Sequence, residues 1–187
     1  MLNKLRSHIE KVILLSDADF ARIAPFFSVQ EAKKNSCIAP EGQRPRYHYF
    51  VVQGLMKLVF TDAQGKAHIV GFAMEDWWES DFEAFYTQQA SRMSLICMED
   101  CVLLAISLAD YKSLLEAVPA MAHFFLEKAY FGFFASQSRV LSRLTSDTQE
   151  RFQQLVHKYP ALLQRVPKAQ LAAYLGVSRE TLSRILL

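Results

Sequence analysis

The last twenty residues, 168–187, constrain the fold more than any other segment of the chain. Their apolar residues follow helical spacing on both sides of Gly176. A helix often ends in a left-handed residue, and glycine adopts that conformation easily because it has no Cβ. Ser178 follows at the position where a side-chain oxygen caps the next helix. The small Ala172 allows the second helix to cross closely over the first. The segment therefore predicts two short helices joined by a tight turn.

The second of these helices has an apolar side and a polar side. Val177, Leu182 and Ile185 are expected to pack it onto the domain. Arginine can donate two hydrogen bonds to the edge of guanine, glutamate can accept one from cytosine, and serine or lysine suits phosphates. We therefore expect a DNA-contacting face, and an ordinary helical hairpin is the alternative. On the second helix the face consists of Arg179, Glu180, Ser183 and Arg184. Ser183, together with Ser178 and Lys168, which precede this helix, is expected to contact phosphates.

Charge is distributed unevenly along the chain. Residues 1–146 hold 15 Lys and Arg against 16 Asp and Glu, a net charge of −1, whereas residues 147–187 hold six against three, a net charge of +3. Positive charge gathered on a small module suits a polyanionic partner such as double-stranded DNA.

Composition excludes several classes of protein. With 51% apolar residues among 187, the chain can bury a core and form one large or two small domains. No run approaches the roughly 20 apolar residues of a membrane span, and the first residues lack the core of a signal peptide. The three cysteines, Cys37, Cys97 and Cys101, form neither a disulfide framework nor a metal-ligand spacing. We expect a cytoplasmic protein without membrane association, metal or cofactor.

Hydrophobic periodicity changes twice along the chain. Residues 4–26 have helical spacing, with Ser16 as an expected cap. Short runs broken by turn residues then predict strands of an antiparallel β-roll, or jelly roll, at 48–52, 55–60, 67–72, 94–98 and 101–107. Residues 77–85 interrupt this rhythm and predict a helical turn. Helical spacing returns at 108–117 and over a long segment at 119–144.

The first half of the long helix is apolar almost all round. Such a helix must be buried on several sides, and a twofold-related copy would cover the side that the roll leaves open. A helix buried within a monomer is the alternative. After it, residues 145–149 contain the S-x-x-Q spacing of a capping box, which begins another helix at a hinge. Pro167 is placed to open the first helix of the C-terminal pair.

This order of elements resembles the Crp/Fnr family of bacterial transcription regulators over nearly the whole chain. The strongest motif is GVSRETLSRIL at 176–186, which is similar to the recognition helix of that family. The Glu41-Gly42 turn, Gly54 and the turn at 98–100 are also similar. The run at 76–82 resembles a subgroup found in Bacteroidetes-type bacteria.

The resemblance implies an α+β fold in three parts: a cyclic-nucleotide-binding-like sensor roll at 1–118, a dimerisation helix at 119–145 and a helix-turn-helix domain at 146–187. It also implies a homodimeric regulator that reads a pseudo-palindromic DNA site through Arg179, Glu180 and Arg184. RNA polymerase and an unidentified small-molecule effector are the further partners that it suggests.

Two departures from the family are visible. The segment 80–92 stands where cyclic-nucleotide-binding members carry a glycine and an arginine for phosphate; here acids stand at Asp81 and Glu83, and Ser91 takes the arginine position. Cyclic AMP is therefore not the expected effector, although another ligand can use a pocket at Trp78, Asp81, Ser91 and Arg92. The sequence also ends without the β-hairpin wing of many relatives, so weaker DNA binding is expected.

Two other functions remain open at this stage. The first is a small-molecule-binding roll whose helix-turn-helix contacts protein instead of DNA. The second is an enzyme, but the chain has no nucleophile elbow, phosphate-binding loop or dinucleotide fingerprint, so we expect no catalytic residues.

Overall fold

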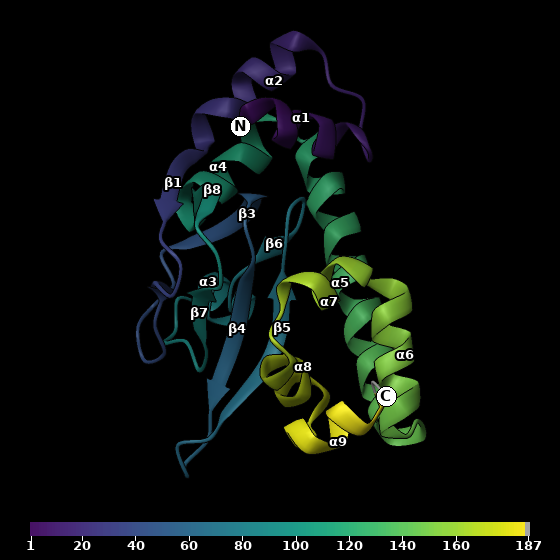
Figure 1. Ribbon diagram of the computed structural model, residues 1–187. Coiled ribbons are helices and arrows are strands. Elements are labelled where there is room, and N and C mark those ends of the chain that lie inside the picture. The colour runs from purple at the N-terminus through teal and green to yellow at the C-terminus, as the bar shows by residue number, and fades with distance from the viewer. Residues whose placement is uncertain (186–187) are drawn as a thin grey trace. The chain divides into compact units, whose positions relative to one another are not determined.

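The computed structural model describes residues 1–185 and has the predicted α+β architecture: an antiparallel β-roll, flanking helices and one long helix (Figure 1). The chain divides into two compact units. One comprises Met1–Phe60 and Gly71–Lys128, and the other comprises Thr61–Val70 and the described residues from Ala129 onward. The domain boundaries given above, at 118 and 145, stay predictions.

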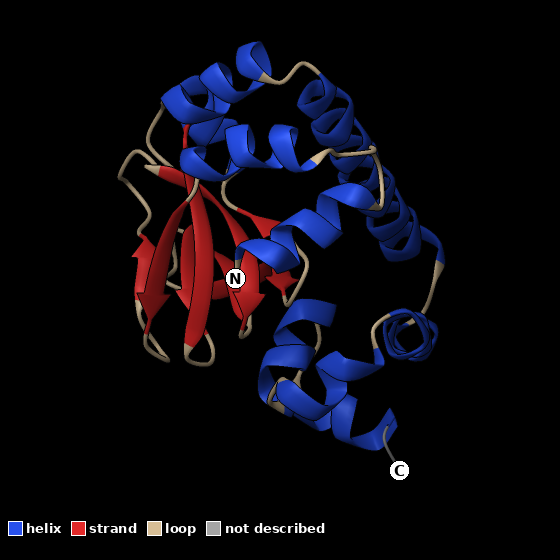
Figure 2. Cartoon of the chain, turned by 90° about the horizontal axis from the view of Figure 1, so that it is seen from above, coloured by secondary structure: helices blue, strands red, loops and turns tan. Residues whose placement is uncertain are grey.

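The β-roll consists of two four-stranded sheets, whose strands gather in one part of the molecule (Figure 2). All five predicted strands are present, together with three short ones that had not been assigned individually. The first sheet has the order β1 (Ser28–Ala32), β8 (Cys101–Ser107), β3 (Tyr47–Gln53) and β6 (Trp78–Glu79). The second has the order β2 (Cys37–Ala39), β7 (Ser94–Cys97), β4 (Met56–Thr61) and β5 (Ala67–Ala73).

Gly54 forms the turn between β3 and β4. Its φ is +107°, and a Cβ built there would lie 2.6 Å from the Sγ of Cys101 and 2.8 Å from the backbone oxygen of Asp100. Only glycine fits both the conformation and the close approach.

Alternation along β3 builds two separate cores. Side chains of successive residues point to opposite faces of a strand. Phe50 and Val52 therefore pack against the helices, in a cluster that includes Leu5, Leu114 and Phe124. The intervening residues face the inside of the roll. This inner cluster comprises Tyr49, Val51, Met56, Leu58, Ala73, Leu95, Cys97, Cys101, Leu103 and Ala105.

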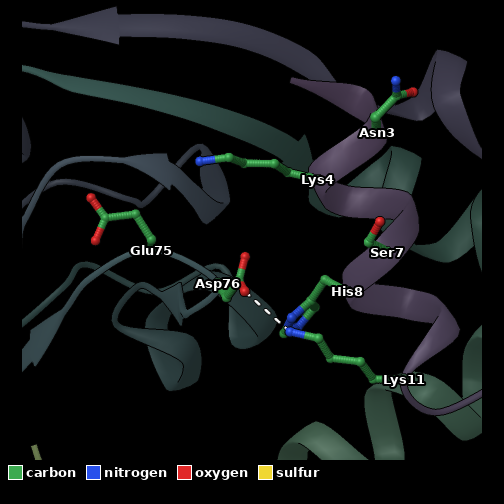
Figure 3. A pocket seen from close by; sticks show the side chains of 7 residues that line it. All are labelled: Asn3, Lys4, Ser7, His8, Lys11, Glu75 and Asp76. Atoms are coloured by element: carbon green, nitrogen blue, oxygen red, sulfur yellow. Dashed lines mark hydrogen bonds and ion pairs between the residues drawn. The ribbon is translucent and has the colours of Figure 1, made fainter.

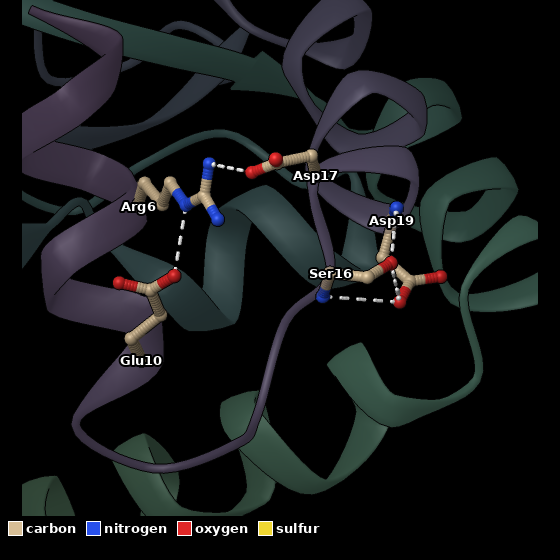
Figure 4. A network of polar contacts seen from close by, with 5 residues as sticks. All are labelled: Arg6, Glu10, Ser16, Asp17 and Asp19. Carbon is tan, nitrogen blue, oxygen red and sulfur yellow. Dashed lines mark hydrogen bonds and ion pairs between the residues drawn. The ribbon is translucent and has the colours of Figure 1, made fainter.

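Helices α1 (Leu2–Glu10), α2 (Asp17–Ile23) and α4 (Leu108–Ala117) gather at one end of the sheets (Figure 1). The helix predicted over 4–26 is interrupted between α1 and α2 and ends in a short 3₁₀ helix, η1 (Ala24–Phe26). Ser16 caps α2 in a capping box with Asp19, and Arg6 forms ion pairs with Glu10 at 2.8 Å and Asp17 at 2.6 Å (Figure 4). The cap fixes where α2 begins.

Two histidines are buried among the aromatic side chains between the first sheet and the helices. The Nδ1 of His48 lies 2.7 Å from the hydroxyl oxygen of Ser80. The indole N–H of Trp78 donates to the Nε2 of His8 at 3.3 Å, which leaves the proton of the neutral ring on Nδ1. Burial lowers the pKa of His48 to about 3 and that of His8 to about 4. Both side chains are therefore neutral in the folded protein.

We expect the free energy of unfolding to fall as the pH drops from 6.5 towards 4.5. In this window an unfolded histidine, with a pKa of about 6.5, binds a proton that the folded histidines do not bind. Each histidine should lower the stability by up to ~1.4 kcal/mol per pH unit. Urea denaturation between pH 7.5 and 4.5 measures this slope, and His48→Gln should remove about half of it. A stability that does not change over this range would contradict the assignment.

Five of the remaining helices come after the roll in the chain, and one lies within it. They are α5 (Ala120–Thr145), α6 (Thr148–Lys158), α7 (Pro160–Arg165), α8 (Lys168–Leu175) and α9 (Arg179–Ile185), with α3 (Phe82–Thr87) inserted earlier, between β6 and β7. Among the helices of residues 1–185, none combines the length and apolar character needed to cross a bilayer.

The start of α6 corrects one prediction. The predicted box at 146 and 149 is wrong by one residue, because Asp147 is the N-cap and exchanges hydrogen bonds with Glu150. A carboxylate accepts the backbone N–H as well as a hydroxyl does, so two overlapping cap patterns compete here. Pro167 likewise precedes α8 as its N-cap instead of standing inside its first turn.

Candidate nucleic-acid interface

The turn between α8 and α9 is built by two residues with separate roles. Gly176 ends α8 in the left-handed conformation, with φ +75°, and the N–H of Val177 donates to the oxygen of Ala172 at 3.0 Å. The hydroxyl oxygen of Ser178 then accepts the N–H of Thr181 at 3.1 Å and caps α9. Both predictions about this turn are confirmed. The cap and the glycine together set the rotation of α9 about its own axis.

Burial divides α9 into two sides. Leu182 is fully buried, and Leu171, Ala172 and Leu175 of α8 are buried as well. Because residues three and four apart share a helix face, this side holds α9 against α8. The opposite side carries exposed polar residues.

Five of the six residues predicted to contact DNA are exposed. They are Lys168, Ser178, Arg179, Glu180 and Arg184. Ser183, the sixth, is half-buried next to Leu182 in the sequence. The structure thus places Arg179, Glu180 and Arg184 together on one short exposed helix, and their contact with DNA stays a prediction.

Glu180 is held in its ionised form. Hydrogen bonds from its own backbone N–H and from the Ser178 side chain lower the pKa of its carboxyl, and the charges of Arg179 and Arg184 act in the same direction. An ionised carboxylate only accepts hydrogen bonds. Chemically, α9 therefore offers two multidentate donors and one acceptor on the same exposed side.

Asp81 organises the segment 80–92. Its carboxylate accepts hydrogen bonds from the N–H of Ala84 at 3.1 Å, the hydroxyl of Ser91 at 2.8 Å and the N–H of Arg92 at 3.2 Å. Asp81 and Ser91 are both buried. The carboxylate thus caps α3 and joins the two ends of the segment from inside.

Replacing Asp81 with alanine should lower the free energy of unfolding by about 2–4 kcal/mol, because three donors lose their acceptor and two of them belong to the buried residues Ala84 and Ser91. Glu83→Ala is a matched control, since Glu83 is exposed two residues away in α3. Its expected effect is within about 0.5 kcal/mol. Urea denaturation of the two variants tests this, and equal losses would show that Asp81 has no special structural role.

The other predicted pocket residues have different surroundings. Trp78 packs in the aromatic cluster, with its ring centroid 5.3 Å from those of Phe50 and Phe125. The Arg92 side chain is exposed and lies 6.0 Å above the ring of Phe60. Asp81 and Ser91 already bond to each other. A ligand pocket at these four residues stays a prediction.

A cavity of about 350 Å³ lies between α1 and the loop after β5 (Figure 3). Its charged side chains are occupied within the protein: the Nζ of Lys11 lies 3.1 Å from Asp76, and the Nζ of Lys4 donates to the backbone oxygen of Val52 at 3.0 Å. Glu75 accepts the N–H of Gly54 at 2.8 Å. The charged groups of this cavity therefore already have partners within the protein.

A second cavity, of about 270 Å³, was not anticipated from the sequence. It lies at the β2–β3 end of the roll. Its polar lining includes Gln30, Gln43, Arg44, Arg46, Tyr47 and Tyr49. In the sequence, the one sign of this cavity is the Arg-Pro-Arg-Tyr run at 44–47. That run cannot be told from an ordinary charged turn.

Cys97 and Cys101 are the buried strand cysteines that were expected. A hydrogen bond between the two thiols, together with burial, raises the pKa of Cys97. Within the described residues, no group of three or more histidine, cysteine or acidic side chains is placed to hold a metal ion.

Comparison with known proteins connects this geometry to a domain family. Residues 29–118 match the family model of the cyclic nucleotide-binding domain. This part of the chain is therefore similar to that domain. The match covers β1 to the end of α4, so it includes the roll and the Asp81 segment and leaves out α5 to α9. A search of curated proteins finds no significant match.

Several solved structures resemble the chain over most of its length. The c-di-GMP responsive regulator CLP of Xanthomonas campestris has a TM-score of 0.74 at 14% identity, covering 91% of this chain and 90% of its own. A putative Crp/Fnr-family transcriptional regulator of Eubacterium rectale has a TM-score of 0.71 at 15% identity, covering 92% and 82%. The Thermus thermophilus catabolite activator protein has 0.60 at 21%, covering 96% and 84%. At these identities the likeness shows the fold alone.

Proposed function

We propose that this chain is a homodimeric, sequence-specific DNA-binding transcription regulator of the Crp/Fnr type. The observation that carries the proposal is α9: its start is set by Gly176 and Ser178, its inner side is buried, and its outer side exposes Arg179 and Arg184. Arginine on a recognition helix is the commonest means of reading guanine in the major groove. The regulators named among the similar structures support the same class.

The exposed face of α5 supports the homodimer. Large apolar side chains along it are uncovered in the single chain, including Phe133 at 57% and Leu144 at 78% exposure. Positions 126, 130, 133, 137, 140 and 144 follow the alternating four- and three-residue spacing of a coiled-coil seam. They are occupied by Leu126, Tyr130, Phe133, Gln137, Val140 and Leu144. A second copy of α5 is the partner that covers such a seam, and Gln137 can set its register.

The Asp81 segment supports an effector other than cyclic AMP, or none. A cyclic phosphate at this segment would meet a buried carboxylate. Two like charges at hydrogen-bonding distance repel, and burial strengthens the repulsion. The sensor role of the roll in this proposal therefore does not depend on a cyclic nucleotide.

An electrophoretic mobility shift with genomic fragments of the source organism tests the function. We expect a subset of fragments to be retained in the presence of excess non-specific DNA. Retention should weaken steeply as the salt concentration rises, because phosphate contacts release counterions. If every fragment competes equally, or none is retained, the helix pair serves another purpose, such as the protein contact considered above.

A further inference from the structure

The cavity at the β2–β3 end of the roll contains polar side chains with no partner in the protein. Within residues 1–185, no hydrogen bond or ion pair engages the side chains of Gln30, Arg44, Arg46 or Tyr49. The two guanidinium groups lie on the loop before β3, two residues apart. None of the described residues that line the cavity carries a carboxylate. The two exposed arginines therefore give the lining of this cavity a positive charge.

Tyr49 is the most informative member of this group. The residue is 3% exposed, and its hydroxyl has no partner within the described part of the chain yet is not fully buried, so the hydroxyl reaches the cavity. Burial raises the pKa of Tyr49 to about 12, so the phenol keeps its proton and can donate a hydrogen bond. Arg46 is close enough to act on the charge of this phenol. A donor that reaches a cavity beside two arginines can pair with an acceptor from outside the protein.

The cavity is also lined by two aromatic rings, tilted at 58° to each other. The rings of Tyr47 and Tyr49 lie with their centroids 6.0 Å apart, and Ile38, Ala39 and Pro45 complete the lining. The volume of about 270 Å³ is just below the usual range of small-molecule sites, about 300–1,000 Å³. This size suits a small metabolite.

We propose that this cavity binds a small organic anion whose carboxylate or phosphate oxygens accept hydrogen bonds from Arg44, Arg46 and Tyr49, and whose planar part lies against the tyrosine rings. A guanidinium group can donate two parallel hydrogen bonds, and this geometry matches the oxygens of a carboxylate or a phosphate. The site is separate in its residues from the Asp81 segment. Its role as the effector site rests on the proposed function; the binding itself does not.

Amide NMR titrations of the full chain with benzoate, phenyl phosphate, inorganic phosphate and the neutral benzamide test the site. Saturable shifts at residues 38–49 are expected with benzoate or phenyl phosphate, and the stronger of the two identifies the preferred oxyanion. Benzamide should bind at least about tenfold more weakly, because it lacks the charge. Inorganic phosphate lacks the ring and should bind more weakly than phenyl phosphate.

Variants separate this site from the Asp81 segment. The double variant Arg44→Gln/Arg46→Gln should weaken anion binding by roughly a hundredfold, since each charged hydrogen bond contributes about tenfold or more. Tyr49→Phe keeps the ring and should lose a smaller factor. Arg92→Gln removes another exposed arginine of the same unit, from the Asp81 segment, and should leave anion binding at this cavity unchanged.

The proposal is overturned if no anion gives saturable shifts, if Arg44→Gln/Arg46→Gln binds as the original protein does, or if Arg92→Gln abolishes binding. DNA retention by ligand-free Arg44→Gln/Arg46→Gln should be unchanged. The two proposals can therefore fail separately. If the original protein retains DNA but binds no anion, this site is wrong; if it binds an anion but retains no DNA, the proposed function is wrong.

Discussion

Arg179→Ala and Arg184→Ala should each weaken binding to a cognate duplex by roughly tenfold to a hundredfold. A bidentate arginine–guanine contact contributes about 1–3 kcal/mol of discrimination, and a symmetric dimer loses the contact twice. Both side chains are exposed on α9, and neither packs in the core. Fluorescence anisotropy with cognate and scrambled duplexes measures the change, and thermal melts show that the variants remain folded.

Two controls distinguish base contacts from general charge. Lys168→Ala should weaken binding to cognate and scrambled duplexes alike, because a phosphate contact carries no sequence information. Arg92→Ala removes the same charge from an exposed site between α3 and β7 and should leave the ratio of the two affinities unchanged. If Arg179→Ala and Arg184→Ala behave as Lys168→Ala does, α9 does not read the base sequence.

Phe133→Glu should convert the protein to a monomer. The change places a carboxylate in the middle of the α5 seam, where pairing would remove it from water next to its own copy. Analytical ultracentrifugation should show the mass falling from twice the chain mass of 21.4 kDa to that mass. Affinity for a two-half-site duplex should fall by at least about a hundredfold, because the second half-site contact is no longer intramolecular.

Phe131→Glu is the matched control for the seam. Phe131 is 62% exposed on the same helix, two residues from Phe133, but lies outside the heptad positions of the seam. The variant should remain a dimer. A monomeric original protein, or equal effects of the two substitutions, would contradict pairing through this face of α5.

The fold could be predicted where periodicity was strong. The runs at 48–52 and 101–107 are apolar because β3 and β8 pack on both faces, one face in each core. β1 and β2 were missed as separate strands. Their sequences, Ser-Val-Gln-Glu-Ala and Cys-Ile-Ala, are short and partly polar, and they form because β8 and β7 offer them a partner. Tertiary pairing overrides local preference in such strands.

The two candidate sites differ in how far the sequence predicts them. The features of α9 are local: a glycine, a serine and a helical repeat within twelve residues define which side chains face outward. The cavity of the roll draws Gln30, Ile38 and Tyr49 from three strands and its arginines from a loop. No local pattern places such residues together, because strand pairing between distant segments does so. Ser183 shows the remaining limit, since a helical repeat does not decide how deep a residue at the edge of the buried side lies.

Selection of bound duplexes from a random-sequence library by the full chain is the most direct test of the central claim, that paired α9 helices read DNA together. We predict an enriched inverted repeat whose two half-sites are centred about 34 Å, or 10–10.5 base pairs, apart. A pool without an enriched motif, or one with a single unpaired half-site, would contradict it.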